Sequence, residues 1–172
     1  MFDTATDPIT IRITTLADLA AVDALLAASY PVLLKPHYPP SVLVMALPLI
    51  SRAQPGLIRS GTYFLAEDAD GTVLAAGGWS HGVPQGGVGP RDLGHIRHVV
   101  THPRAVRQGL GSAILRHAMC QALRAGITRL HCQSTRTAVP FFQALGFRVA
   151  GDIDITLRPG ITFPAVQMTR PL

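Results

Sequence analysis

The chain has 172 residues, of which 48% are hydrophobic and 15% are charged, and this balance excludes an intrinsically disordered protein. The length fits a single domain over residues 1–172 with a substantial core. The two cysteines, Cys120 and Cys132, exclude a disulfide framework, and no metal-ligand spacing surrounds them. We therefore expect one globular domain without a metal site.

The N-terminal segment has no features of an export signal. The first ten residues, MFDTATDPIT, carry acids where a signal peptide needs basic residues, and no apolar core follows them. The longest apolar run, residues 42–50, is short and contains Pro48, which excludes a bilayer span there. We expect a soluble, cytoplasmic protein with no membrane partner.

The first half of the chain predicts a strand, two helices and a hairpin. Thr15 fits the N-cap of a helix, because leucine, alanine and valine recur after it at helical spacing. Four prolines interrupt the segment PVLLKPHYPPSV, which predicts a loop over residues 31–42. In chain order we expect a strand over 9–14, a helix over 15–29, a helix over 42–53 kinked at Pro48, and strands over 62–67 and 72–80.

The second half of the chain alternates strands with helices. Pro103 ends one strand, and Gly126 and Gly146 each close a helix. In chain order we expect a loop over 82–90, a strand over 92–101, a helix over 109–125, a strand over 127–134, a helix over 137–145, and strands over 147–157 and 162–169. The class is mixed α/β (α+β) with a largely antiparallel sheet, and residues 92–134 predict one parallel crossover.

The net charge of +5 is unevenly distributed along the chain. Residues 93–151 contain no Asp or Glu but eight arginines and five histidines. A stretch without carboxylates favours a polyanionic ligand, although an arginine-rich composition with solvated side chains gives the same pattern. Nucleic acid is disfavoured as the ligand, because no helix-turn-helix, zinc finger or RNA-binding motif is present.

The stretch VRQGLGSAIL, residues 106–115, places two glycines at the start of a predicted helix. Backbone N–H groups left unobstructed at a helix N-terminus bind anions. A dinucleotide fingerprint needs a third small residue where Ile114 stands, and an acid about twenty residues later; both are missing. The phosphate-binding loop of ATPases needs a Gly-Lys-Ser/Thr ending, which is also missing. Glycines used only for close helix packing are the other interpretation.

Two segments resemble the GNAT superfamily of N-acetyltransferases. VVTHPRAVRQGLGSAIL resembles the family's strand, Arg-Gln-Gly-x-Gly turn and helix, and STRTAVPFFQALGFRV resembles its later helix, which ends in Gly-Phe. The element order also fits, so the resemblance covers most of the chain. It implies a mixed, mostly antiparallel sheet of six to seven strands flanked by about four helices. It also implies an acyltransferase that moves an acetyl group from acetyl-CoA to a primary amine by direct transfer.

The resemblance implies where acetyl-CoA binds. In the family, backbone amides of the glycine turn hold the pyrophosphate, and the preceding strand pairs with the pantetheine arm. Val106 departs from the family, which often has Arg or Gln there, and Arg107 would then supply the charge. The implied donor-site residues are Val99, Val100, Thr101, Arg107, Gln108, Gly109, Leu110, Gly111, Ser112 and Phe142.

The resemblance also implies catalytic roles. His95 matches a position where some family members carry Glu, and an imidazole suits a general base, with a water relay as the alternative. The backbone amide of Val99 matches the group that stabilises the oxyanion. Phe142 stands where the family often has a tyrosine acid, so water or a hydroxyl such as Ser134 would have to protonate the sulfur. Strand alternation predicts one shared face for His95, Arg97, Val99 and Thr101.

The acceptor pocket implied by the resemblance is built from the first two helices, their connection and the loop after the third strand. These segments hold polar and aromatic residues in an apolar setting, which suits a small molecule. The candidate substrate-binding residues are Tyr30, His37, Tyr38, Trp79, His81 and Arg97.

Other functions stay open. A non-catalytic CoA-binding sensor or regulatory module would explain Phe142 in place of tyrosine, and a nucleotide-binding protein would contain the glycine turn by chance. If the protein is an acetyltransferase, its acceptor could also be a peptide amine or an aminoacyl-RNA. The positive net charge is compatible with the RNA alternative. By analogy, the C-terminal strands over 152–169 could form a homodimer contact.

Overall fold

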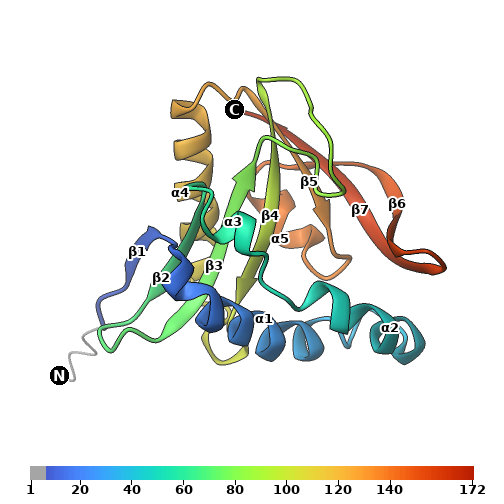
Figure 1. Cartoon of the computed structure of the whole chain (residues 1–172), viewed down its shortest axis with the longest axis horizontal. Coiled ribbons are helices and arrows are strands. Elements are labelled where there is room, and N and C mark those ends of the chain that lie inside the picture. The colour runs from blue at the N-terminus through green and yellow to red at the C-terminus, as the bar shows by residue number, and fades with distance from the viewer. Residues whose placement is uncertain (1–6) are drawn as a thin grey trace.

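The computed structural model describes residues 7–172, which form one seven-stranded sheet in the order β1-β2-β3-β4-β5-β7-β6, with helices on both faces (Figure 1). The first six residues of the segment considered as a signal peptide lie outside the described part. The strands are β1 (Thr10–Ile13), β2 (Tyr63–Glu67), β3 (Val73–Ser80), β4 (Leu93–Thr101), β5 (Arg129–Ser134), β6 (Arg148–Arg158) and β7 (Ile161–Pro171). The helices are α1 (Leu19–Leu33), α2 (Pro40–Ile50), α3 (Pro55–Ile58), α4 (Leu110–Arg124) and α5 (Val139–Ala144), with 3-10 turns η1 (Leu16–Asp18) and η2 (Pro103–Ala105).

The sheet is mixed and mostly antiparallel, as expected. Over residues 7–172 every neighbouring pair of strands is antiparallel except β4 and β5, which are joined through α4. This confirms the predicted parallel crossover. β4 and β5 pair only over residues 93–95 and 129–131. Beyond that point β4 stays with β3 and β5 stays with β7, so the sheet splits between its two central strands.

A bulge lies in the middle of β4. Ala76 pairs with Val100 and Gly78 pairs with Arg97, so β4 has one more residue than β3 between these two pairs. His98 lies within this interval and has a φ of 40°. An extra residue reverses the alternation of side chains beyond it. Ile96 and Val99, three residues apart, therefore pack in the same core, whereas Val100 packs in the core on the other face. The predicted shared face of His95, Arg97, Val99 and Thr101 is wrong, because the bulge separates the first two from the last two.

Helices cover both faces of the sheet (Figure 1). On one face, α4 and α5 form the largest core, in which Ile114 and Leu115 are fully buried. On the other face, α1 and α3 bury Val22 and Leu26 against β2, β3 and β4. α2 covers the β6–β7 hairpin in a third, smaller cluster that contains Phe163. β4 is thus covered by α4 on one face and by α1 on the other.

α1 is longer than its sequence pattern predicts. The helix runs to Leu33 and includes Pro31, where we expected a loop to begin. Its end is anchored because Leu34 is 2% exposed and donates its N–H to the Tyr30 carbonyl at 3.0 Å. This burial offsets the hydrogen bond that proline cannot make. α2 then begins at Pro40, since proline suits the first helical position.

One helical segment of the described chain, Leu16–Leu33, is long and apolar enough by length and composition to cross a membrane. It comprises η1 and α1. Its side chains Val22, Leu25 and Leu26 pack against the sheet. Helices that cover a sheet also have this composition, so the segment is weak evidence for a membrane span.

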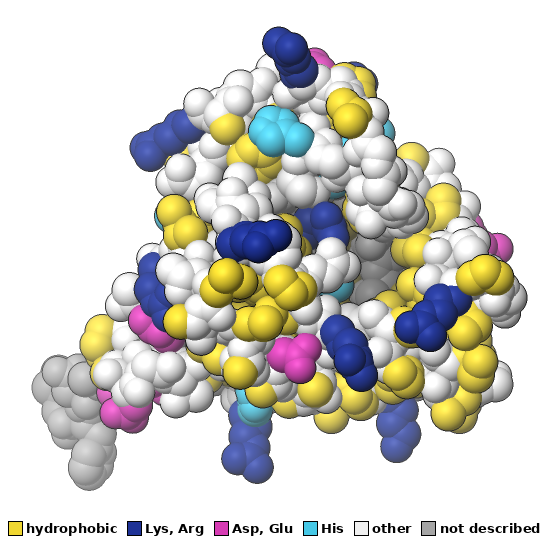
Figure 2. Space-filling model, viewed as in Figure 1, with side chains coloured by type: hydrophobic (Ala, Val, Ile, Leu, Met, Phe, Trp, Pro, Cys, Tyr) yellow, Lys and Arg dark blue, Asp and Glu magenta, His cyan; other side chains and the backbone are white. Residues whose placement is uncertain are grey.

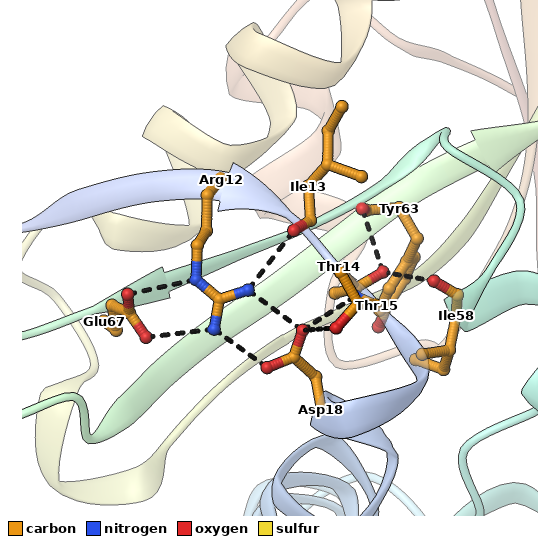
Figure 3. Close-up of polar contacts among 8 residues, drawn as sticks. All are labelled: Arg12, Ile13, Thr14, Thr15, Asp18, Ile58, Tyr63 and Glu67. Atoms are coloured by element: carbon orange, nitrogen blue, oxygen red, sulfur yellow. Dashed lines mark hydrogen bonds and ion pairs between the residues drawn. The ribbon is translucent and has the colours of Figure 1, made fainter.

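A charged cluster joins β1, β2 and η1 (Figure 3). The Arg12 guanidinium donates to both carboxylate oxygens of Asp18, at 2.8 and 2.9 Å, and to both of Glu67, at 3.0 and 3.2 Å. Asp18 also accepts the Thr15 backbone N–H at 2.7 Å, which completes the turn before α1. The hydrogen bonds from Arg12 lower the pKa of Asp18.

Candidate functional site

The glycine turn before α4 lines a cavity of about 280 Å³. The cavity lies between this turn, the end of β4 and the C-terminal part of α1. Most of the predicted donor-site residues meet here: Val99, Val100, Thr101, Arg107, Gly109, Leu110, Gly111 and Ser112. Gln108 and Phe142 are not among its lining residues.

The glycine turn and the first turn of α4 line this cavity, and no side chain caps the start of the helix. Gly109 is the N-cap of α4 with a φ of 80°, and it has no side chain to accept from the first turn of the helix. A Cβ on Gly111 would lie 3.2 Å from the Thr101 hydroxyl and 3.3 Å from the Phe141 ring, so the backbone here is closely packed. Exposed N–H groups and the helix dipole together suit an anion.

Phe141, and not Phe142, lines the cavity. Phe142 is 4% exposed, and its ring packs against Phe141 and Phe147 at centroid distances of 5.1 and 5.3 Å. Successive helical residues point about 100° apart, so two neighbours do not share one face. The structure thus places Phe141 at the cavity and the predicted donor-site residue Phe142 in the core.

A second cavity, of about 530 Å³, lies on the other side of the split between β4 and β5. Figure 2 shows it as a hollow above α2, with basic but no acidic side chains visible inside. Its charged and polar lining residues are Arg97, His98 and Arg158, the amides Gln54, Gln85 and Gln133, and the hydroxyl residues Tyr30, Thr135 and Thr156. Among the described residues that line it, there is no Asp or Glu.

The two cavities meet at Tyr30 and Thr135, which line both. The Tyr30 hydroxyl lies 3.5 Å from the Nδ1 of His98. Burial raises the pKa of Tyr30, and burial together with the nearby Arg97 lowers the pKa of His98 to about 4. Both side chains are therefore uncharged at neutral pH.

His95 lies outside both cavities. Its side chain is buried on β4, and its Nε2 has no hydrogen-bond partner among the described residues. The ring of His131 lies edge-on to it at 5.8 Å. Burial, His131 and Arg97, in that order, lower the pKa of His95. A neutral imidazole with a free nitrogen can act as a base, and here it would need water to reach either cavity.

Ser134, the predicted source of a proton, also faces away from the cavities. It is 2% exposed, and its hydroxyl donates to the Thr135 carbonyl at 2.7 Å. The next residue, Thr135, lines both cavities and was not among the sequence-predicted residues. Strand alternation predicts that Ser134 and Thr135 point to opposite faces of the sheet. It does not predict which of them faces the split between β4 and β5.

Four of the predicted acceptor residues do not line either cavity. Tyr38 donates to the Pro164 carbonyl and accepts the Arg136 N–H, both at 2.8 Å, so it connects the α1–α2 loop to the sheet. Trp79 is buried in the core at 2% exposure, next to the exposed His81. The exposed His37 contacts Thr137 at 3.0 Å. Of the six candidates, Tyr30 and Arg97 reach the second cavity.

Several residues of the second cavity carried no signal in the sequence. Gln54, Gln85 and Arg158 come from three separate loops or strand ends and meet only in the fold.

No group of three His, Cys, Asp or Glu side chains within residues 7–172 is arranged to hold a metal ion.

Comparison with known proteins identifies the fold and the family. The solved structure of a GCN5-related N-acetyltransferase from Rhodopseudomonas palustris is 17% identical with a TM-score of 0.76, and the match covers 100% of this chain and 99% of that one. The PaiA N-acetyltransferase from Thermoplasma acidophilum, solved in complex with coenzyme A, is 15% identical with a TM-score of 0.72, over 96% and 99% of the two chains. A GCN5-related N-acetyltransferase from Kribbella flavida is 22% identical with a TM-score of 0.61, over 95% and 98%.

At the level of sequence, no curated protein matches the chain significantly. The family model of the acetyltransferase (GNAT) domain matches residues 59–149, which is more than half of the chain and runs from before β2 into β6. This range includes β4, the glycine turn, α4 and α5. The chain belongs to the GNAT family of acetyltransferases.

Proposed function

We propose that this protein is an acetyl-CoA-dependent N-acetyltransferase that acetylates the primary amine of a small molecule by direct transfer. One observation carries the proposal: two cavities lie on opposite sides of the split between β4 and β5 and meet at Tyr30 and Thr135. Two substrates bound in these cavities could meet at that point and react without a covalent enzyme intermediate.

The first cavity is the proposed donor site. The N–H groups at the start of α4 would hold the pyrophosphate, and Arg107 would add positive charge beside it. β4 has no β5 partner beyond His95, so its backbone over residues 99–101 is available to the pantetheine arm. Acetyl-CoA would therefore enter along the diverging edge of β4 with its thioester directed toward the junction.

The reaction needs a base, an oxyanion donor and an acid. The amine nitrogen attacks the acetyl carbonyl carbon, and the Val99 N–H stabilises the charge that develops on the carbonyl oxygen. His95, acting through water, or water alone takes the proton from the amine. The C–S bond then breaks, and the sulfur takes up a proton as the thiol forms.

Tyr30 is the proposed acid, because Phe142 has no hydroxyl group with which to protonate the sulfur. Its hydroxyl lies at the junction of the cavities, and its raised pKa keeps it protonated at neutral pH. Ser134 is less suited, because its hydroxyl is buried and already donates to a carbonyl. After transfer, the proton released by the amine would restore the tyrosine through solvent.

The proposal is tested first by calorimetry with acetyl-CoA. Gly111→Glu places a carboxylate where the anion should bind, so we expect micromolar binding in the natural protein and none in the variant. Leu123→Glu is the matched control, because it adds the same charge to an exposed position at the far end of α4. A screen of amines for release of free CoA thiol follows. Binding without any transfer would favour a non-catalytic CoA-binding module.

Two further expectations belong to this proposal. A cytoplasmic location would give the protein access to acetyl-CoA. A homodimer through β6 and β7 would use the sheet edge opposite β1, where β6 is the outermost strand. Size-exclusion chromatography with light scattering measures the oligomeric state.

A further inference from the structure

The second cavity contains an arginine without a counter-ion. Arg97 lies on β4 and is partly buried. Its Nη1 donates to the Ser80 hydroxyl at 3.2 Å and its Nη2 to the Gln54 amide oxygen at 2.7 Å. Both acceptors are uncharged, and a guanidinium has five N–H donors. The Arg97 charge is thus only partly solvated by the protein, and donors remain for a ligand.

Arg12 is a structural arginine whose charge is neutralised by carboxylates of the same chain, in contrast to Arg97. Arg12 is bound by two carboxylates (Figure 3), and their hydrogen bonds raise its pKa. The pKa of Arg97 is lowered instead, because it is buried without an anion. The ion pairs among residues 7–172 involve Arg12 or Arg129, and none involves Arg97. A partly buried cation without a partner costs stability, which points to a ligand as the missing anion.

The surroundings of Arg97 favour the same kind of ligand. Arg158 adds a second positive charge to the lining, and no carboxylate of the described chain competes for either arginine there. Apolar side chains of α2 and β7, among them Ile50 and Phe163, form another part of the wall. The cavity therefore offers a cationic end, an apolar wall and a junction with the donor site.

We propose that the acceptor is an amino-acid-like molecule, an amine that also carries a carboxylate, and that Arg97 binds this carboxylate. The inference rests on the proposed function, since the amine must reach the junction at Tyr30. Paired N–H groups of a guanidinium match the two oxygens of a carboxylate. Arg158 attracts the anion to the cavity, and the apolar wall accommodates the uncharged part of the acceptor.

The test compares acceptors that differ only in this charge. Amino acids, their carboxamides and the corresponding amines without the carboxyl group are assayed with acetyl-CoA. We expect kcat/KM to be about 100-fold higher for the acids. Arg97→Gln should abolish that preference and leave the Kd of acetyl-CoA unchanged, and Arg97→Lys should restore part of it. Arg148→Gln removes an exposed arginine outside both cavities and is the matched control.

A binding measurement separates this inference from the proposed function. Calorimetry of the CoA-loaded protein with N-acetylated amino acids and their carboxamides does not require turnover. Tighter binding of the acids, lost in Arg97→Gln, supports the carboxylate site even if no amine is acetylated. Equal binding of acids and carboxamides overturns it. Acetylation of neutral amines with no preference for acids overturns the inference and leaves the proposed function intact.

Discussion

The Tyr30 hydroxyl on α1 and the Nδ1 of His98 on β4 lie 3.5 Å apart where the two cavities meet. The β4 bulge produces this contact, because His98 adopts a φ of 40° and turns out of the regular strand alternation. The Tyr63 hydroxyl holds the bulge by donating to the His98 carbonyl at 2.8 Å. Two tyrosines from different elements thus flank one histidine at the centre of the site.

Tyr30→Phe tests the proposed acid. Removing the hydroxyl should lower kcat by about 100-fold, because the departing sulfur would lose its proton donor. The Kd of acetyl-CoA should stay unchanged, since the aromatic ring still fills the wall of the donor cavity. Thiol release measures kcat, and calorimetry measures the Kd. A variant with unchanged kcat would show that water protonates the sulfur.

His98 should make the protein less stable as the pH falls. Burial, with Arg97, lowers its pKa from 6.5 to about 4. The unfolded chain therefore binds a proton near pH 6.5 that the folded chain does not bind until near pH 4. Stability from this residue is complete above pH 6.5 and is lost through that window as the pH decreases.

His98→Asn isolates this contribution, because asparagine tolerates a positive φ and does not titrate. The acid-induced loss in the free energy of unfolding should be smaller in the variant by on the order of 2 kcal/mol. Urea denaturation at several pH values measures it in both proteins. Parallel curves would mean that His98 is protonated in the folded protein as readily as in the unfolded chain.

His95 is the candidate base, and its variants should affect turnover more than binding. We expect His95→Ala to lower kcat by about 100-fold with little change in the Kd of acetyl-CoA. Because its pKa is lowered by burial, kcat/KM should decrease only as the pH drops below 6.5, the ordinary value for histidine. His95→Gln should abolish that decrease. Unchanged turnover of His95→Ala at neutral pH would exclude His95 and leave a water relay as the base.

Phe142→Tyr should not restore a missing acid. The new hydroxyl would be buried in the core against Phe147, and it would cost about 1–3 kcal/mol of stability without a partner. Turnover should be unchanged in the fraction that folds. Phe141→Tyr is the control, because Phe141 lines the donor cavity and its hydroxyl could reach solvent. Thermal unfolding and thiol release at high pH compare the two, and faster turnover of Phe142→Tyr would contradict its position in the core.

Local patterns predicted the strand–turn–helix unit over β4 and α4 well. A strand that ends at His102-Pro103 and a helix that begins after Gly109 depend on residues close in sequence, and both appear as expected. The first cavity is built around that unit, and eight of its lining residues were therefore among the predicted donor-site residues. The order strand, glycine turn, helix, strand also predicted the parallel crossover, although it pairs residues 93–95 with the distant residues 129–131.

The residues around the second cavity are positioned by tertiary contacts that a single sequence does not predict. The bulge at His98 arises where β4 pairs with β3, and one extra residue moved His95 and Arg97 to the face opposite Val99. Tyr38 was a reasonable pocket residue by position in its loop, yet it bonds the backbone of β7. Such outcomes are decided by tertiary packing, which single-sequence periodicity does not report.

The loop over residues 82–90 should control access of the acceptor. The side-chain amides of Gln85 and Gln133 hydrogen-bond reciprocally, at 2.5 and 3.0 Å, and join this loop to β5 at the wall of the second cavity. Gln85→Ala removes both hydrogen bonds. The loop would then lose conformational entropy when the acceptor binds, and this cost would weaken acceptor binding.

We expect Gln85→Ala to raise the KM of the acceptor by about tenfold, with the Kd of acetyl-CoA unchanged because the donor cavity does not include this loop. Hydrogen exchange over the loop should become faster. Gln143→Ala, at an exposed position on α5, is the matched control. Faster exchange with an unchanged KM would mean that the loop covers the cavity without contributing to acceptor binding, and specificity would then reside in β4 and α2 alone.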